Sequence, residues 1–305
     1  MPTTLQLTAM KKPISTDAAE FGELTVCNEW LTQPAMLREH MATEGYIYLK
    51  NVLDVNLIGQ ARRVMAERLA DIGHVDRTYP LDECRAMPKS TVQFMPDLSK
   101  DNPALMQVLY DGRMMEIFAD LLDAAVRHYD FTWVRAVAPK RGTPPHMDIV
   151  YMGRGTKQLY TAWTPLMDVP LQMGGLMILE RSHQHTRLNE GYGAKDVDEF
   201  CTNKVGDNYT GMGGGGNIRN GGWLSDNPAK LRTALGGRWL SSDFQAGDVL
   251  IFSVFTVHTS LDNASDRIRL STDTRYQRAD EPIDERWIGE EPIGHGSAGK
   301  RGKIC

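Results

Sequence analysis

The sequence has few cysteines, no long apolar run and no basic excess. Its four cysteines are scattered over 305 residues without a Cys-x-x-Cys pair, which argues against a zinc knuckle or a redox dithiol. Neither the N-terminus nor any later segment has the apolar length of a signal peptide or a membrane span. We therefore expect a protein of the reducing cytoplasm with no membrane partner.

The charge balance is slightly acidic, with a formal net charge of −5 and a pI of about 5.9. A nucleic-acid-binding surface needs a basic excess, so we expect a small-molecule partner and no nucleic acid. No basic patch that would bind the phosphates of a CoA thioester is visible in the sequence either. The oligomeric state is left open, and a homo-oligomer is compatible with the sequence.

The front third of the chain has mostly helical patterns. Residues 46–49, rich in aromatic and branched side chains, are predicted to form a strand. Asp54 is typical of an N-cap, and the apolar residues of 55–72 recur at the spacing of an amphipathic helix. A further helix is predicted to begin at Asn102-Pro103 and to break near residues 111–112.

From residue 128 the pattern changes to short runs of β-branched and aromatic residues separated by Pro and Gly. Repeated short strands are typical of a sandwich or barrel of the jelly-roll kind, on which the front helices would pack from one outer side. We therefore predict a mainly β fold with α, a cupin-like double-stranded β-helix. The expected strands are 128–137, 148–152, 158–164, 176–179, 249–257 and 268–276.

These patterns predict one domain at residues 31–280, preceded by an N-terminal arm at 1–30 and followed by a C-terminal tail at 281–305. The helical part of this domain would span residues 31–127, and the β-helix core 128–280.

A segment at about 184–237 departs from the strand rhythm and is predicted to be an insertion. Its glycine run at 211–216 lacks the strand-to-helix context of a phosphate-binding loop. Glycine-rich runs are usually flexible, and long loops in compact domains often cover active sites. We expect a lid here, with an interface as the open alternative.

The motif His146-Met147-Asp148 is the first candidate for a functional site. On a strand, side chains two apart share one face, so this histidine and aspartate would point the same way. His258 follows the apolar run 249–255, which is typical of a buried strand that would hold the histidine rigidly. Two imidazoles and one carboxylate suit non-haem Fe(II).

The run at residues 267–275 carries polar side chains at every odd position. The guanidinium of Arg269 beside the hydroxyl of Ser271 has the chemistry to bind the distal end of a dicarboxylate. For Arg267 and Arg275 the expectation is a solvated face.

Together these features resemble the phytanoyl-CoA dioxygenase family of Fe(II)/2-oxoglutarate oxygenases. The resemblance runs from about residue 128 to 278 and is clearest at 145–148, 161–164, 174–183 and 247–269. It implies that a double-stranded β-helix holds iron through His146, Asp148 and His258.

The resemblance also implies a 2-oxoglutarate pocket. Arg269, eleven residues after the late histidine, would bind the distal carboxylate of the cosubstrate, next to Ser271. Ser260 and Trp163 fall on positions that belong to the same pocket in the family.

The implied activity is hydroxylation of a small polar or charged metabolite, with Fe(II), 2-oxoglutarate and O₂, and release of succinate and CO₂. Asp148 favours hydroxylation over halogenation because the halogenating relatives lack that carboxylate. Desaturation or another oxidation stays open, as does the substrate. Tyr160, Arg135 and Asp130 alternate toward a cavity and are candidates for substrate binding, with a solvated outward face as the alternative for each.

Two other classes of protein fit part of the pattern. One is a cupin-like metal-binding or sensing domain without oxygenase turnover. The other is a hydrolytic or isomerising enzyme with Zn²⁺ or Mn²⁺, since two histidines and a carboxylate also bind zinc. Arg269 with Ser271 discriminates against the hydrolase, which has no need for a dicarboxylate-binding arginine.

Overall fold

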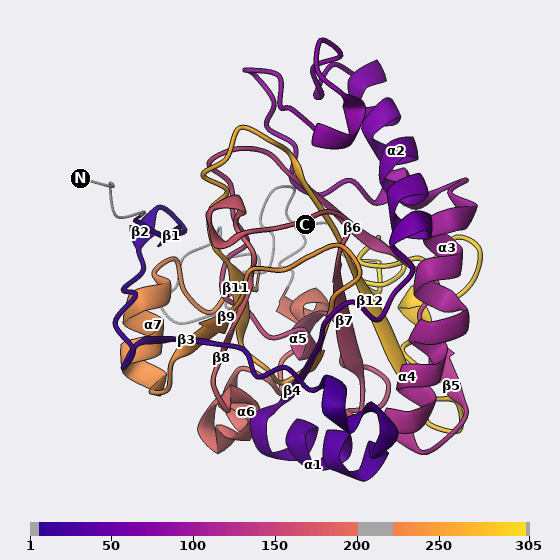
Figure 1. Ribbon diagram of the computed structural model, residues 1–305. Helices are drawn as coiled ribbons and strands as arrows, with labels where there is room; N and C mark the ends of the chain where they lie inside the picture. The colour runs from indigo at the N-terminus through magenta and orange to yellow at the C-terminus, as the bar shows by residue number, and fades with distance from the viewer. Residues whose placement is uncertain (1–5, 201–221, 303–305) are drawn as a thin grey trace.

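Two β-sheets form the centre of the protein, as a computed structural model of residues 6–200 and 222–302 shows (Figure 1). The larger sheet has the order β4-β10-β7-β12-β5, with β6 also paired to β12, and the smaller sheet has the order β11-β8-β9-β3. The predicted jelly-roll core is confirmed. The larger sheet comprises β4 (Tyr46–Leu49), β5 (Val126–His128), β6 (Trp133–Val137), β7 (Tyr160–Pro165), β10 (Val249–Ser253) and β12 (Arg269–Arg278). The smaller comprises β3 (Phe21–Glu23), β8 (Leu176–Leu179), β9 (Trp239–Ser241) and β11 (His258–Ser260).

The side chains of strand β12 alternate between two faces of the larger sheet, one toward the smaller sheet and one toward the covering helices. Its register with β7 places Trp163 opposite Asp273 and Thr161 opposite Arg275, so these four side chains share the face toward the smaller sheet. Its other face carries the uncharged side chains of Leu270, Thr272, Thr274 and Tyr276 over most of its length. Tyr276 stacks on Phe118 of a covering helix at 4.0 Å between ring centroids. The polar odd positions therefore line the interior of the jelly roll.

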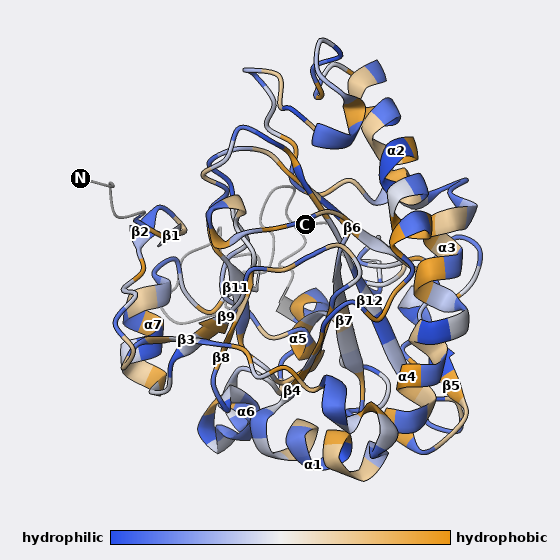
Figure 2. Cartoon of the chain, in the orientation of Figure 1, coloured by the Kyte–Doolittle hydropathy of each residue, from blue (hydrophilic) through white to orange (hydrophobic). Residues whose placement is uncertain are grey.

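The covering helices lie on the outer side of the larger sheet, as predicted (Figure 1). The Asp54 carboxylate accepts hydrogen bonds from the amides of Asn56 and Leu57, which confirms the predicted N-cap. Figure 2 shows mixed blue and orange bands on these helices, as expected where one face is buried. The covering helices are α1 (Pro34–Glu44), α2 (Val55–Asp71), α3 (Pro103–Tyr110) and α4 (Gly112–Leu122). Three further helices lie later in the described chain: α5 (Ile149–Met152), α6 (Thr186–Gly191) and α7 (Pro228–Leu235).

Two strand predictions were wrong in part, and the strand predicted at 148–152 was wrong throughout. The expected strand 128–137 is interrupted between β5 and β6, and the expected strand 249–257 ends at Ser253 before the chain crosses to β11 in the other sheet. Residues 149–152 form α5 instead of a strand. In each case an apolar run contains a turn that apolar content alone does not reveal.

Both ends of the described chain contribute to the core. A hairpin of β1 (Thr8–Ala9) and β2 (Lys12–Pro13) precedes β3, which pairs in parallel with β9. Near the other end, Trp287 is 2% exposed. The division into arm, domain and tail stays a prediction, but the terminal segments pack on the jelly roll.

Two further expectations concern the insertion and membranes. The glycine run 211–216, on which the predicted lid rests, lies outside the described residues. None of the helices in the described ranges has the length and apolar character to cross a membrane.

Candidate metal centre and adjoining cavity

Three buried side chains converge at one end of the jelly roll. One ligating atom each from His146, Asp148 and His258 lie within 4.8 Å of one another. Asp148 Oδ1 is 3.5 Å from His146 Nε2 and 3.7 Å from His258 Nε2. The structure thus brings together the three residues that the sequence selected as metal ligands.

The backbone achieves this convergence differently from the expected strand. His146 and His258 each donate their amide to the carbonyl of the other at 3.0 Å, forming an isolated antiparallel bridge. Asp148 has helical φ and ψ of −65° and −27° at the start of α5. A bridge between two chain segments and a helical turn therefore aim the three side chains at one point.

The histidine tautomers are fixed for metal binding. His146 Nδ1 lies 2.8 Å from the carbonyl of Pro144, and His258 Nδ1 lies 3.0 Å from the carbonyl of Thr256. A carbonyl only accepts, so each Nδ1 carries the proton and each Nε2 keeps a free lone pair. Burial, and then the neighbouring His146, lower the pKa of His258 to about 4 despite Asp148. His258 is therefore neutral at physiological pH, as a ligand must be.

The second oxygen of Asp148 is held by two donors. Arg275 Nη2 donates to Asp148 Oδ2 at 2.8 Å, and Thr161 Oγ1 donates to the same atom at 2.5 Å. Burial disfavours the carboxylate, but Arg275 and the two histidines outweigh it and keep the pKa of Asp148 well below its ordinary value. The carboxylate is ionised, with Oδ1 directed toward the histidines.

Arg275 is a buried neighbour of the candidate metal centre that the sequence reading missed. We expected it on a solvated face, yet its side chain is 2% exposed and its guanidinium lies 4.1 Å from the centroid of the Trp133 ring. The sequence did contain an indication of this burial, because Arg275 and Arg269 are both odd-numbered residues of one strand and so share a face. A buried arginine beside a buried carboxylate neutralises part of the charge that Asp148 brings into the core.

Arg269 and Ser271 are also buried on this face. Arg269 Nη1 donates to the carbonyl of Gly174, whereas Arg269 Nε and Ser271 Oγ have no hydrogen-bond partner among the described residues. Burial lowers the pKa of Arg269 to about 10, so the guanidinium stays charged at neutral pH. A buried cation with an unused donor next to an unused hydroxyl fits an acidic ligand.

The other two residues assigned to the cosubstrate pocket have different surroundings. Trp163 is buried, with the Arg269 guanidinium 5.9 Å from its ring centroid. Ser260 Oγ accepts a hydrogen bond from the amide of Thr143 at 2.8 Å. Ser260 therefore fixes the loop that leads to His146.

A cavity of about 360 Å³ opens beside the three convergent side chains. Of the substrate candidates only Arg135 lines it, and Arg135 Nε donates to Asp273 at 2.9 Å. Tyr160 shares a face with Tyr276, away from the interior, because it is one residue out of phase with Thr161. Asp130 is exposed and accepts a hydrogen bond from the amide of Gly289 at 2.6 Å.

The wall of this cavity includes several aromatic and apolar residues that sequence reasoning did not select: Phe94, Trp133, Tyr151, Met152 and Trp223.

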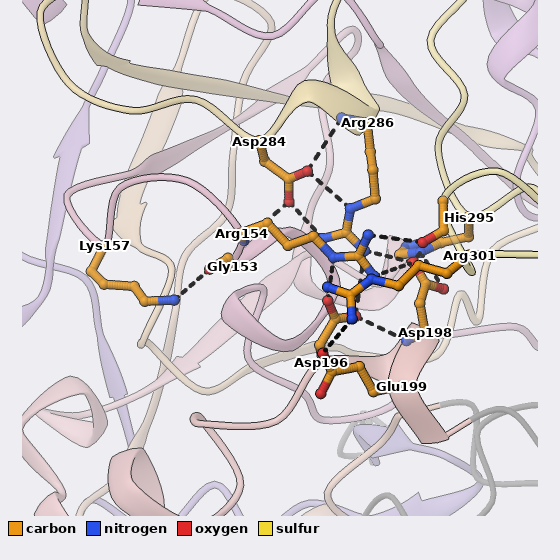
Figure 3. Close-up of polar contacts among 11 residues, drawn as sticks. Gly153, Arg154, Lys157, Asp196, Asp198, Glu199, Asp284, Arg286, His295 and Arg301 are labelled. Carbon is orange, nitrogen blue, oxygen red and sulfur yellow. Dashed lines mark hydrogen bonds and ion pairs between the residues drawn. The ribbon is translucent and has the colours of Figure 1, made fainter.

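The C-terminal segment supplies part of the cavity wall through His295. Figure 3 shows the polar contacts that surround this residue. His295 Nδ1 lies 3.1 Å from both carboxylate oxygens of Asp198. Arg286 donates to Asp198 and to Asp284 at 2.5 Å each. This buried network connects the segment after α6 to the C-terminal residues and places both next to the site.

The comparisons with known proteins agree with this geometry. The family model described as phytanoyl-CoA dioxygenase (PhyH) matches residues 42–271. The chain is 27% identical over 274 residues to 1-deoxypentalenic acid 11-beta-hydroxylase of Streptomyces exfoliatus, covering 83% of this chain and 84% of that one.

Solved structures share the fold. The non-haem alpha-ketoglutarate-dependent carbocyclase SnoK of nogalamycin biosynthesis has a TM-score of 0.57 at 20% identity, over 86% of this chain and 89% of that one. The epimerase SnoN, in complex with Fe³⁺, alpha-ketoglutarate and nogalamycin RO, has a TM-score of 0.55 at 19% identity, over 86% and 93%. Since the family model covers most of the chain, the resemblance in the sequence is confirmed, and this protein belongs to the phytanoyl-CoA dioxygenase family.

Proposed function

We propose that this protein is an Fe(II)- and 2-oxoglutarate-dependent oxygenase that hydroxylates a small organic molecule. The observation that carries the proposal is the convergence of His146, Asp148 and His258 beside a cavity, in a jelly roll that also buries Arg269. A metal-binding domain without turnover or a zinc hydrolase would not need the buried arginine. The family and the hydroxylase relatives support the same reaction class.

The roles of the residues follow from their contacts. His146 Nε2, His258 Nε2 and Asp148 Oδ1 would hold iron on one face, and Arg269 with Ser271 would bind the distal carboxylate of 2-oxoglutarate. When bound, iron with 2-oxoglutarate and O₂ supplies the oxidation of a substrate C–H bond, with release of succinate and CO₂. The chain contributes fixed ligand orientations and a cavity lined largely by aromatic and apolar side chains.

The substrate that fits this cavity is a small molecule with an apolar body and a polar or charged group. Aromatic and apolar side chains dominate the wall, while Arg135 and Gln93 supply polar contacts. The 27% identical relative is named for the hydroxylation of an organic acid, which supports a substrate of this kind. Cys27 and Cys84 are buried and unpaired, which favours the cytoplasm as the compartment.

Anaerobic addition of Fe(II) and 2-oxoglutarate tests the function. We expect the weak visible charge-transfer band of an iron–2-oxoglutarate chelate, and succinate formation once O₂ is admitted. Asp148→Ala should abolish both. Arg269→Met should mainly raise the concentration of 2-oxoglutarate needed, whereas Arg267→Met, which alters a partly exposed arginine on the same strand run, should not.

Two results would contradict the proposed oxygenase function. Full succinate formation by the Asp148→Ala protein, or absence of the band in the wild-type protein with tight Zn²⁺ binding, would favour the non-oxygenase alternatives.

A further inference from the structure

A second chamber of about 630 Å³ adjoins the cavity of the metal centre. Both have Gln93, Pro144 and Trp223 in their walls, so they are neighbouring parts of one hollow. Pro144 also accepts the hydrogen bond from His146 Nδ1, which places the shared wall next to a candidate metal ligand. An elongated molecule can therefore extend from the metal centre into the outer chamber.

The outer chamber is basic although the chain as a whole is acidic. Lys11, Lys140 and Arg141 line it, and Asp262 is the single acidic residue among the described residues of its wall. One oxygen of that carboxylate, Asp262 Oδ2, accepts a hydrogen bond from the backbone amide of Lys11 at 2.8 Å. In the described parts of the chain no side-chain ion pair involves any of these three cations. Their charge is available to a ligand.

The backbone that presents Lys11 and Lys140 is strained. Met10 and Lys11 form the turn of the β1–β2 hairpin with φ of +52° and +61°, and Lys140 has φ of +65°. Such values are costly for residues with a side chain, and non-glycine residues that keep them tend to occur at ligand-binding positions. The Asp262 contact and the bond from Lys140 N to the carbonyl of Asn263, at 2.6 Å, hold both loops in place.

We propose that this chamber binds an anionic group, a carboxylate or a phosphate, at the end of the substrate farther from the metal. The proposal rests on the proposed function and names its substrate class: an amphiphilic anion, with an apolar part in the aromatic cavity and a charged end at Lys11, Lys140 and Arg141. Arg269 is separate from this site, because its buried guanidinium belongs to the interior face of β12.

The test is calorimetric binding of three probes that share an eight-carbon chain: octanoate, octyl phosphate and octan-1-ol. The protein is kept anaerobic with Fe(II) and saturating 2-oxoglutarate, so that the carboxylate probe does not compete for Arg269. We expect at least one anion to bind about tenfold tighter than the alcohol, since each exposed ion pair contributes a few-fold. Higher ionic strength should reduce this preference. The tighter of the two anions identifies the group.

The triple variant K11Q/K140Q/R141Q should lose the preference for anions. The matched variant R63Q/K12Q/K230Q removes the same charge from positions outside both chambers and should keep it. Equal binding of anions and alcohol by the wild-type protein, absence of binding by all three probes, or a preference that survives in the triple variant overturns the proposal. Binding needs no turnover, so this outcome is distinct from a missing charge-transfer band, which would contradict the oxygenase function instead.

Discussion

At the scale of single residues, the site depends on charges that are buried and mutually compensated. Asp148 is ionised in the core because Arg275 and two histidines surround it. Arg275 in turn has Nε and Nη1 without hydrogen-bond partners among the described residues, and its guanidinium lies over Trp133. The arginine positions the carboxylate, and the negative charge of the carboxylate compensates the buried positive charge of the arginine.

Replacing Arg275 by leucine should weaken Fe(II) binding by about 10- to 100-fold, the usual cost of losing a residue that orients a metal ligand. Arg275→Lys should recover only part of the affinity, because an ammonium cannot both stack on Trp133 and reproduce the planar geometry. Anaerobic Fe(II) titration measures both effects. Arg267→Leu serves as the control on the same strand run. Wild-type affinity in Arg275→Leu would contradict the positioning role.

The pKa of His258 predicts how the stability of the metal-free protein depends on pH. The folded pKa of about 4 lies below the ordinary value of 6.5, so between these values the unfolded chain binds a proton that the folded chain does not. The free energy of unfolding should therefore fall by up to roughly 3 kcal/mol as pH decreases from about 6.5 to 4.

Urea unfolding at several pH values measures this slope. His258→Asn should remove most of it. Some slope should persist because burial also lowers the pKa of His40. His74→Asn, which alters a histidine outside the metal-centre cavity, should leave the slope in place. An unchanged slope in His258→Asn would show that other groups control acid sensitivity.

At the scale of elements, the sequence predicted what local pattern encodes and missed what long-range pairing decides. The cap at Asp54, the helix break near residue 111 and strand β8 follow from neighbouring residues and are confirmed. The turn at Asp148 and the pairing of His146 with His258 depend on contacts more than 100 residues apart. The three candidate ligands therefore come together as expected, but on a backbone that differs from the predicted strand.

The turn after α5 shows such a long-range dependence. A Cβ on Gly155 would lie 2.6 Å from the amide nitrogen of Asp284 and 2.8 Å from the carbonyl oxygen of Pro282. Gly155→Ala should therefore push the C-terminal segment away and lower the free energy of unfolding by about 1–3 kcal/mol. Gly59→Ala, within α2 and with open space at its Cβ, should instead raise it by about 0.5–1 kcal/mol. Urea unfolding compares the two, and equal effects would contradict the close approach.

At the scale of the whole molecule, residues distant in sequence assemble both parts of the hollow. Lys11 comes from the N-terminal hairpin and Lys140 and Arg141 from the loop after β6, which explains why no basic patch was visible in the sequence. The C-terminal segment, predicted to be a tail, reaches the cavity through His295. Charge clustering and wall composition are properties of the fold, and a linear pattern does not contain them.

Arg286 is one of the residues that attach this C-terminal segment to the rest of the molecule, through Asp198. It is 3% exposed and pairs with Asp198 and Asp284, whose side chains are 0% and 1% exposed. Arg286→Met would remove a charged partner from two buried carboxylates, although Asp198 would keep His295 and Asp284 would keep the amide of Arg154, so we expect a cost of up to about 3–5 kcal/mol. We expect a fall in Tm on the order of 10 °C and faster chymotryptic cleavage after Trp287, which is buried in the folded protein. Arg301→Gln, which breaks an exposed pair with Glu199 at 3.6 Å, should change neither measurement. Equal behaviour of the two variants would mean that the C-terminal segment is held by apolar packing around Trp287 alone.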